Sequence, residues 1–107
     1  MQRVADDYKA ECYVQKKMPQ VKEFAARLRM PVPKLSRTFL STIGVRPSVY
    51  FKEGQIERVK ECLISTDLSL EAIAEITGFA NVTTLSRSFR RITGMTPGAF
   101  RARYRHK

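Results

Sequence analysis

Side chains suited to catalysis or metal binding are scarce in this sequence of 107 residues. It contains two cysteines, Cys12 and Cys62, and one histidine, His106, next to the C-terminal residue. Zinc sites of the usual ligand spacing are excluded because no CxxC pair is present, and nucleophilic Ser–His or Cys–His catalysis has almost no candidates. Glycine-rich phosphate loops of the GxGxxG or GxxxxGKS/T type are also absent. We therefore expect no enzyme, no metal and no cofactor, and we interpret both cysteines as small apolar residues on helix faces.

Long apolar runs are missing too. No stretch of 18 apolar residues occurs, and the N-terminal MQRVADDYKAEC has no apolar signal core, so we expect a cytoplasmic protein without a membrane partner. With 43% hydrophobic and 28% charged residues, the chain can build a core, which excludes wholesale disorder. Its length indicates one small domain or two very small helical units that share a linker.

Acidic residues are few, and their positions are uneven. Lysine and arginine total 20 against 10 aspartates and glutamates, a net charge of +10, so a polyanion is the expected partner: nucleic acid first, an anionic membrane surface second. Two windows, 24–52 and 76–107, contain no acid at all. A soluble surface normally mixes its charges, so both windows are predicted to face phosphates.

The two acid-free windows contain the same sequence unit twice. A shift of 50 residues places Leu35-Ser36-Arg37 on Leu85-Ser86-Arg87, Phe39 on Phe89, Gly44 on Gly94 and Pro47 on Pro97. Upstream the shift is 49 and places Val21 on Leu70, Phe24 on Ile73, Ala25 on Ala74 and Met30 on Phe79. The one-residue difference belongs in a turn, where an insertion is cheapest. We therefore predict one supersecondary unit of about 27 residues, present twice.

Each copy predicts a helix-turn-helix, that is, a helix, a short turn and a second helix. In the first copy, Pro19 or Gln20 opens a helix whose apolar residues recur at helical spacing, and Pro31 ends it. In the second copy, Ser69 and Asn81 are N-caps, and Gly78 can adopt the left-handed conformation of the turn. The inward side chains expected on the second helices are Leu35, Phe39 and Ile43 in the first copy and Leu85, Phe89 and Ile92 in the second.

A long helix over 47–65 is predicted between the copies, because Pro47 suits a first helical turn. Its buried apolar stripe is expected to consist of Tyr50, Ile56, Val59 and Leu63. At ~1.5 Å per residue the helix is about 28 Å long. Major-groove faces recur every ~34 Å on one side of B-DNA, so this rigid connector can set two helices into successive grooves. The flanking helices expected are one from Ala5 to about Lys17, with Val4, Tyr8 and Cys12 inward, and one from Pro97, with Phe100 and Tyr104 inward.

These residues resemble the DNA-binding domain of the AraC (arabinose-operon regulator) family of bacterial transcription factors. The strongest stretch covers 67–103 and has the sequence DLSLEAIAEITGFANVTTLSRSFRRITGMTPGAFRAR. Its GF at 78–79, FRR at 89–91 and G-x-x-P at 94–97 match the family signature in order and spacing. The first motif, LRMPVPKLSRTFLSTIGVRP, and the linker follow the pattern too, so the resemblance covers about 4–105.

The resemblance implies an all-α fold of seven helices: a first helix-turn-helix subdomain (1–46), a linker helix (47–65) and a second subdomain (66–107). The third and sixth helices would lie in the major groove of promoter DNA. Base-reading positions then fall on Pro33, Ser36, Arg37, Val82, Thr83, Ser86, Arg87 and Arg90. Phosphate contacts are expected from Lys34, Arg46, Arg91, Arg101 and Arg103. Arg37 and Arg87 either grip guanine through O6 and N7 or hold phosphate.

The resemblance also implies partners beyond DNA: RNA polymerase, and an N-terminal effector or dimerisation domain outside this sequence. We favour a fragment of such a regulator over a short regulator complete in itself. Four positions depart from the family pattern: Arg29 replaces a usual glycine, Pro31-Val32-Pro33 replaces larger or polar side chains, Gly54 interrupts the linker helix, and Gln55 replaces a common arginine. The second motif is therefore expected to be the principal reader of bases, with the first held mostly by backbone contacts.

Two other classes of protein compete with this interpretation. A sequence-independent nucleoid or RNA-binding protein would suit the net charge of +10 but would leave the paired motifs unused. A domain linked to a DNA-repair methyl acceptor would need a reactive cysteine in a suitable setting, and neither Cys12 nor Cys62 has one. The ratio of specific to random-duplex affinity separates the first of these classes from a transcription factor.

Overall fold

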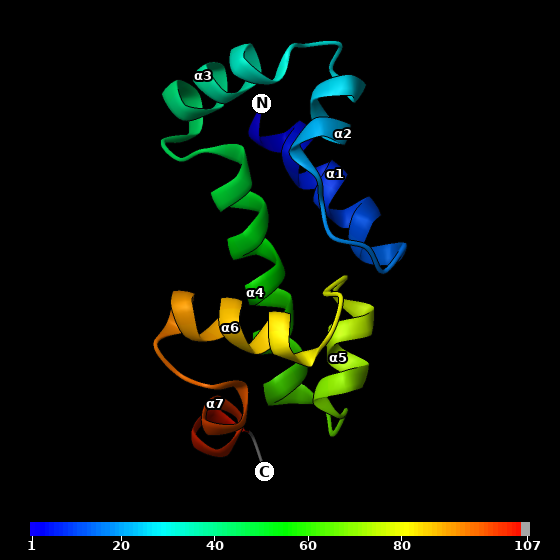
Figure 1. Ribbon diagram of the computed structural model, residues 1–107, viewed down its shortest axis with the longest axis vertical. Coiled ribbons are helices and arrows are strands. Elements are labelled where there is room, and N and C mark those ends of the chain that lie inside the picture. The colour runs from blue at the N-terminus through cyan, green and yellow to red at the C-terminus, as the bar shows by residue number, and fades with distance from the viewer. Residues whose placement is uncertain (106–107) are drawn as a thin grey trace.

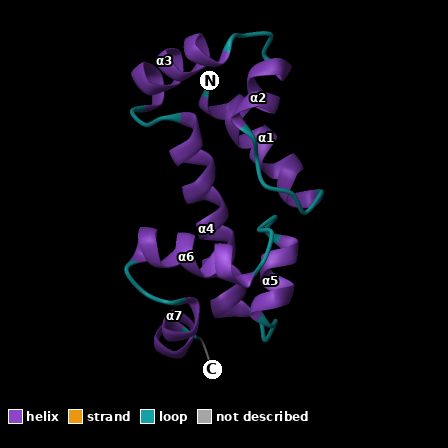
Figure 2. Ribbon diagram, in the orientation of Figure 1, coloured by secondary structure: helices purple, strands orange, loops and turns teal. Residues whose placement is uncertain are grey.

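The computed structural model describes residues 1–105, so His106 and Lys107 lie outside the described residues. The described chain is all-α and contains no strand (Figure 2). Its seven helices confirm the predicted fold class and are α1 (Gln2–Val14), α2 (Val21–Arg27), α3 (Val32–Ile43), α4 (Pro47–Ser65), α5 (Leu70–Ile76), α6 (Val82–Thr93) and α7 (Pro97–Tyr104). None of the helices within 1–105 is both long and apolar enough to cross a bilayer.

Two separate hydrophobic cores lie at the two ends of α4. The first joins α1, α2, α3 and the beginning of α4 around Tyr8, Phe24, Phe39 and Phe51, whose rings pack at centroid distances of 5.2 to 6.4 Å. The second joins the rest of α4 to α5, α6 and α7. Its buried members are Ile56, Val59, Cys62, Leu63, Ile73, Ala74, Phe79, Leu85 and Phe89. Each helix-turn-helix unit therefore has a core of its own, and α4 belongs to both (Figure 1).

The linker helix has the predicted bounds, with Pro47 at its first helical position and Ser65 as its last residue. Proline is favoured there because its missing N–H would have no intrahelical acceptor and its φ already suits the helix. At ~1.5 Å per residue the 19 residues span about 28 Å. Gly54 lies in the middle of this helix, where a Cβ would meet only the far end of the flexible Lys9 side chain, at 2.9 Å from Cδ.

The turns between paired helices are equivalent in the two units and use a left-handed residue. Arg29 has φ 55° and Gly78 has φ 83°, and these two residues correspond under the shift of 49. After each, a backbone N–H reaches back five residues, from Met30 to the Ala25 carbonyl and from Phe79 to the Ala74 carbonyl. This is the Schellman pattern of helix termination. Arg29, which replaces a usual glycine, is therefore strained, because a residue with a Cβ is disfavoured in the left-handed region.

Some sequence-based expectations about helix ends and inward faces were wrong. Helix α1 ends at Val14 rather than near Lys17, because Lys16 turns left-handed at φ 58°. Val4, Ile92 and Tyr104 are exposed by 42%, 40% and 43%, respectively, although each was expected to point inward. On α6 the inward row continues from Phe89 to Thr93, which is half-buried, and not to the exposed Ile92. Tyr104 still packs its ring 4.7 Å from that of Phe100, at the outer edge of the second core.

Candidate nucleic-acid interface

Helices α3 and α6 present equivalent outer faces. Leu35 and Phe39 on α3, and Leu85 and Phe89 on α6, are fully buried, so the opposite side of each helix points to solvent. Both helices end at a left-handed glycine, with φ 95° at Gly44 and φ 80° at Gly94. In Figure 1 α3 lies at one end of α4, α6 crosses the other half, and both run in the same direction across the view. The fold thus repeats one helix orientation at two places along a single connector.

Among the residues that the structure describes, the cations on these two outer faces have no acidic partner. Exposed basic residues on α3 are Lys34 and Arg37, and those on α6 are Arg87, Arg90 and Arg91. Every ion pair found within 1–105 lies elsewhere, on α1, α2, α4 and the segments around them: Asp6–Lys9, Glu11–Arg27, Lys17–Glu23, Glu57–Lys60, Arg58–Glu61 and Asp67–Arg105. The outer faces of α3 and α6 are therefore positively charged and uncompensated, which is the arrangement that attracts phosphates.

The two helices begin differently. Asn81 caps α6, because its side-chain oxygen accepts from the Thr84 N–H at 2.8 Å and from the Thr84 hydroxyl at 2.9 Å. Helix α3 follows Pro31, which offers no capping side chain. At the positions predicted to read bases, Thr83 and Arg90 are exposed on α6, while Val82 and Ser86 are half-buried; on α3 Pro33 is exposed and Ser36 half-buried. All eight predicted base-reading residues lie on these two helices, and five of them are exposed, since Arg37 and Arg87 are exposed as well.

Four of the five residues predicted to contact phosphate are exposed, namely Lys34, Arg46, Arg91 and Arg103. Arg101 is different, because its guanidinium is engaged inside the molecule. Its Nε donates to the Leu63 carbonyl at 3.1 Å, and Nη2 donates to the Thr66 carbonyl at 3.1 Å and to the Cys62 carbonyl at 3.4 Å.

These carbonyls belong to the last turn of α4 and the residue after it, where helices leave acceptors without intrahelical donors. Arg101 therefore caps the end of α4, and these hydrogen bonds occupy the guanidinium that was expected to contact phosphate. The repeat contained the signal that was missed: under the shift of 50, Arg101 corresponds to Phe51, a buried core residue.

A contact between the two units holds them in one arrangement. The turn at Gly78 lies against the loop between α1 and α2, so closely that a Cβ there would be 2.4 Å from Lys17 C and 2.4 Å from Met18 N. Beside it, the buried Gln55 amide donates from Nε2 to the Thr77 carbonyl. These contacts add to the shared helix α4, so the positions of α3 and α6 relative to each other are set by packing on two sides.

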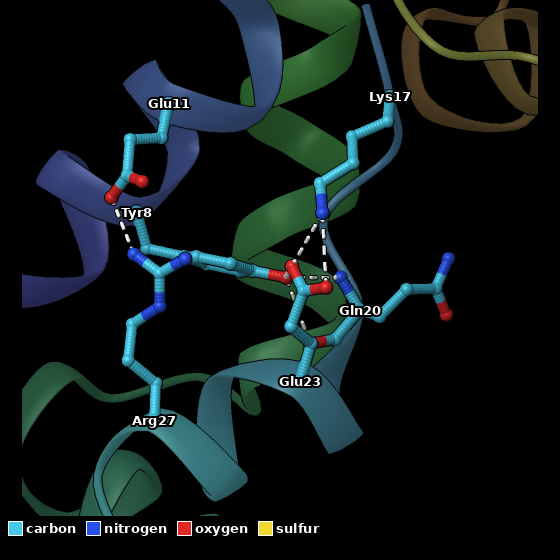
Figure 3. A network of polar contacts seen from close by, with 6 residues as sticks. All are labelled: Tyr8, Glu11, Lys17, Gln20, Glu23 and Arg27. Atoms are coloured by element: carbon cyan, nitrogen blue, oxygen red, sulfur yellow. Dashed lines mark hydrogen bonds and ion pairs between the residues drawn. The ribbon is translucent and has the colours of Figure 1, made fainter. Parts of the chain in front are cut away.

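A polar network holds α2 on α1 beside this contact (Figure 3). The Tyr8 hydroxyl donates to Glu23 Oε1 at 2.8 Å and accepts from the Gln20 N–H at 2.9 Å, while Lys17 Nζ lies 2.9 Å from both Glu23 oxygens. On the other side of the ring, Arg27 pairs with Glu11 and stacks its guanidinium over Tyr8. The hydrogen bonds from Lys17 and Tyr8 keep the pKa of Glu23 below its usual range. This network fixes the packing of α2, the first helix of the helix-turn-helix, against α1.

The two cysteines lie in separate cores and are unpaired. Cys12 is fully buried in the first core and Cys62 is buried in the second. Burial raises the pKa of both thiols, so neither has the thiolate character of a nucleophile. Within residues 1–105 no three His, Cys, Asp or Glu side chains come together as a metal site.

Comparison with known proteins identifies the family. A family model described as a helix-turn-helix domain matches residues 24–103, most of the chain. The transcriptional regulator RipA of Corynebacterium glutamicum is 35% identical over 80 residues, which are 75% of this chain and 24% of RipA. An uncharacterized HTH-type regulator of Bacillus subtilis, YfiF, is 39% identical over 71 residues, 66% of this chain and 22% of YfiF. The chain belongs to the AraC-type helix-turn-helix DNA-binding domains of bacterial transcription regulators, a family of regulators and not of enzymes.

Solved structures show the same architecture. The DNA-binding domain of AdpA, determined in complex with a target DNA, superposes with a TM-score of 0.81 at 27% identity and covers 94% of this chain and 91% of that domain. The C-terminal domain of the response regulator yesN from Fusobacterium nucleatum superposes with a TM-score of 0.86 at 23% identity, covering 94% and 96% of the two chains. By contrast, the chain spans only 22%, 24% and 11% of the lengths of YfiF, RipA and a second B. subtilis regulator, YtdP.

Proposed function

We propose that this domain binds promoter DNA sequence-specifically, with α3 and α6 in successive major grooves on one side of the duplex. The observation that supports it is the pair of uncompensated basic faces on equivalent helices joined by one connector of about 28 Å. Successive major-groove faces are ~34 Å apart. A connector of about 28 Å, with α3 at one end and α6 packed across the other half, each about 10 Å wide, suits that spacing (Figure 1).

Different residues are assigned to base reading and to phosphate binding. On α6, the exposed Arg87 and Arg90 can each donate two hydrogen bonds to guanine O6 and N7, and Thr83 can bond a base edge. On α3, Ser36 and Arg37 occupy the positions of Ser86 and Arg87. Lys34, Arg46, Arg91 and Arg103 are assigned to the phosphate backbone, where they set register without carrying sequence information.

In vitro selection of bound duplexes from a random pool tests the proposal. One enriched site with two half-sites about one helical turn apart is expected. On that site, Arg87→Ala should lose about 1–3 kcal/mol and relax the preference at one base pair. Arg103→Ala is the matched control, because an exposed arginine on α7 should weaken all duplexes by a similar factor. A uniform loss for Arg87→Ala would make that residue a phosphate contact.

Salt dependence tests whether both helices dock. With roughly 6–10 phosphate contacts, log K should fall with log salt at about −0.9 per contact. A slope shallower than about −3 contradicts docking by both units. If no site is enriched and random duplexes bind equally well, the domain is a sequence-independent binder, the alternative that the net charge of +10 favours.

We further propose that the domain works as part of a longer regulator. The support is the length of its relatives, of which it spans a quarter or less in YfiF, RipA and YtdP. An effector-sensing or dimerisation domain and contacts with RNA polymerase would belong to that longer protein. Affinity for a single selected site, compared between this domain and the full-length protein with and without candidate effectors, tests the assignment.

A further inference from the structure

Apolar side chains occupy part of the outer face of α3. Leu40 is 46% exposed and Val32 is 37% exposed, and Pro33 is exposed as well. Pro33 and Leu40 are seven residues apart, two turns of the helix, so they lie above one another on the same side. Arg37 lies between them along this face. Large exposed aliphatic residues elsewhere occur on other elements, such as Val14 on α1.

Helix α6 presents polar groups at the same positions. Under the shift of 50, Pro33 corresponds to Thr83 and Leu40 to Arg90, whereas Arg37 corresponds to Arg87. The two helices share bounds, buried residues and terminal glycine under that shift, so their outer faces are directly comparable. At the positions of Pro33 and Leu40, one scaffold thus carries hydrogen-bonding side chains on α6 and hydrocarbon on α3, whereas the position of Val32 is a valine on both helices.

We propose that α3 recognises thymine 5-methyl groups in the major groove through Leu40 and Pro33, with Val32 at the edge of the contact. This inference rests on the proposed function. Duplex DNA is the occupant that fits, because the hydrocarbon is bordered by the cations Lys34 and Arg37 and the window 24–52 contains no acid. Among the base edges of the major groove, the thymine methyl is the apolar feature, and aliphatic side chains recognise it by contact. Helix α3 then contributes to sequence choice through hydrocarbon rather than holding backbone alone.

Deoxyuridine substitution tests the contact directly, since it removes the methyl group and keeps the base pairing. The α3 half-site of the selected duplex is located first, with a Ser41→Cys protein that carries an iron chelate at the new thiol and cleaves nearby DNA. Replacing thymines there by deoxyuridine should weaken binding about fourfold for each methyl contacted, the factor that corresponds to about 0.8 kcal/mol for one methyl-sized group. The same replacement in the α6 half-site is measured in parallel, and any change there should be the same in the unchanged protein and in Leu40→Ser, because Leu40 lies on α3.

Protein variants assign the effect to the side chain. Leu40→Ser should lose the discrimination between thymine and deoxyuridine at the methyl that Leu40 contacts, because the hydrocarbon partner of that methyl is gone, while a methyl contacted by Pro33 should keep its effect. Val14→Ser is the matched control, since Val14 is an exposed aliphatic residue, 80% exposed, on α1, away from the outer face of α3, and it should keep the full discrimination. Circular dichroism and thermal melting confirm that both variants are folded before binding is compared.

The result that overturns the proposal is a single enriched site at which deoxyuridine replacement in the α3 half-site changes nothing. An unchanged ratio in Leu40→Ser, together with a loss of self-association in analytical ultracentrifugation, would assign the surface to a protein partner and equally overturn it. Failure to enrich any site is a different outcome, because it contradicts the proposed function itself.

Discussion

Among the five glycines, Gly78 is predicted to be the one at which an added methyl group destabilises the domain most. Gly78→Ala places an L residue at φ 83°, which costs about 1–2 kcal/mol, and its Cβ would meet Lys17 C and Met18 N at 2.4 Å. Carbon atoms in contact are normally ~3.5–4.0 Å apart, so the loop between α1 and α2 must move by more than about 1 Å. Such overpacking costs about 1–3 kcal/mol more. We expect a total loss of about 2–5 kcal/mol.

Gly94→Ala separates the two contributions. Gly94 has nearly the same backbone conformation, φ 80°, but nothing lies within 4 Å of a Cβ added there. This variant should lose only the conformational part, about 1–2 kcal/mol. Urea unfolding followed by circular dichroism measures both free energies of unfolding, and the difference between the two variants is the cost of the clash between the added Cβ and the loop at 17–18.

Binding adds a second readout for the same pair. Because the Gly78 contact sets the position of one unit against the other, Gly78→Ala should weaken binding to a duplex with both half-sites more than binding to either half-site alone. Gly94→Ala, on the same unit but away from the contact, should affect both kinds of duplex alike. Equal losses of stability in the two alanine variants would refute the reasoning, because the close approach at Gly78 would then have no energetic consequence.

Three further stability changes are expected, each measured by chemical denaturation. Gly54→Ala should stabilise the linker helix by about 0.5–1 kcal/mol, since the added Cβ displaces only a flexible lysine tip; a less stable variant would mean that the glycine is needed for packing. Arg101→Ala should cost about 1.5–3 kcal/mol, because it removes the charged donor that caps the end of α4. Arg103→Ala removes an exposed arginine from α7, the helix that also contains Arg101, and should cost less than about 0.5 kcal/mol. Equal effects would contradict the capping role. Gln55→Met should cost about 1–3 kcal/mol, because it leaves the Thr77 carbonyl without its buried donor; an unchanged free energy of unfolding would show that this carbonyl needs no partner.

Local sequence signals determined the helices and their order. Apolar spacing, the N-caps Ser69 and Asn81 and the proline at 47 act within one or two turns, so they define elements wherever the chain places them. The internal repeat went further, because two copies of one unit must use equivalent inner and outer faces. It located the outer faces of α3 and α6 from the sequence alone, and the family resemblance agreed with it.

Only the tertiary structure decided where long side chains point and which turns touch. Arg101 donates to carbonyls that lie 35 to 39 residues away along the chain, and the residues next to Arg101 do not predict such acceptors. The demand for glycine at 78 likewise comes from the loop at 17–18, whereas its counterpart Arg29 adopts the same left-handed conformation with a side chain. Contacts between distant segments depend on packing between helices, which periodicity along one helix does not encode. Sequence therefore determined the elements and their faces, and tertiary packing decided how Arg101 and Gly78 are used.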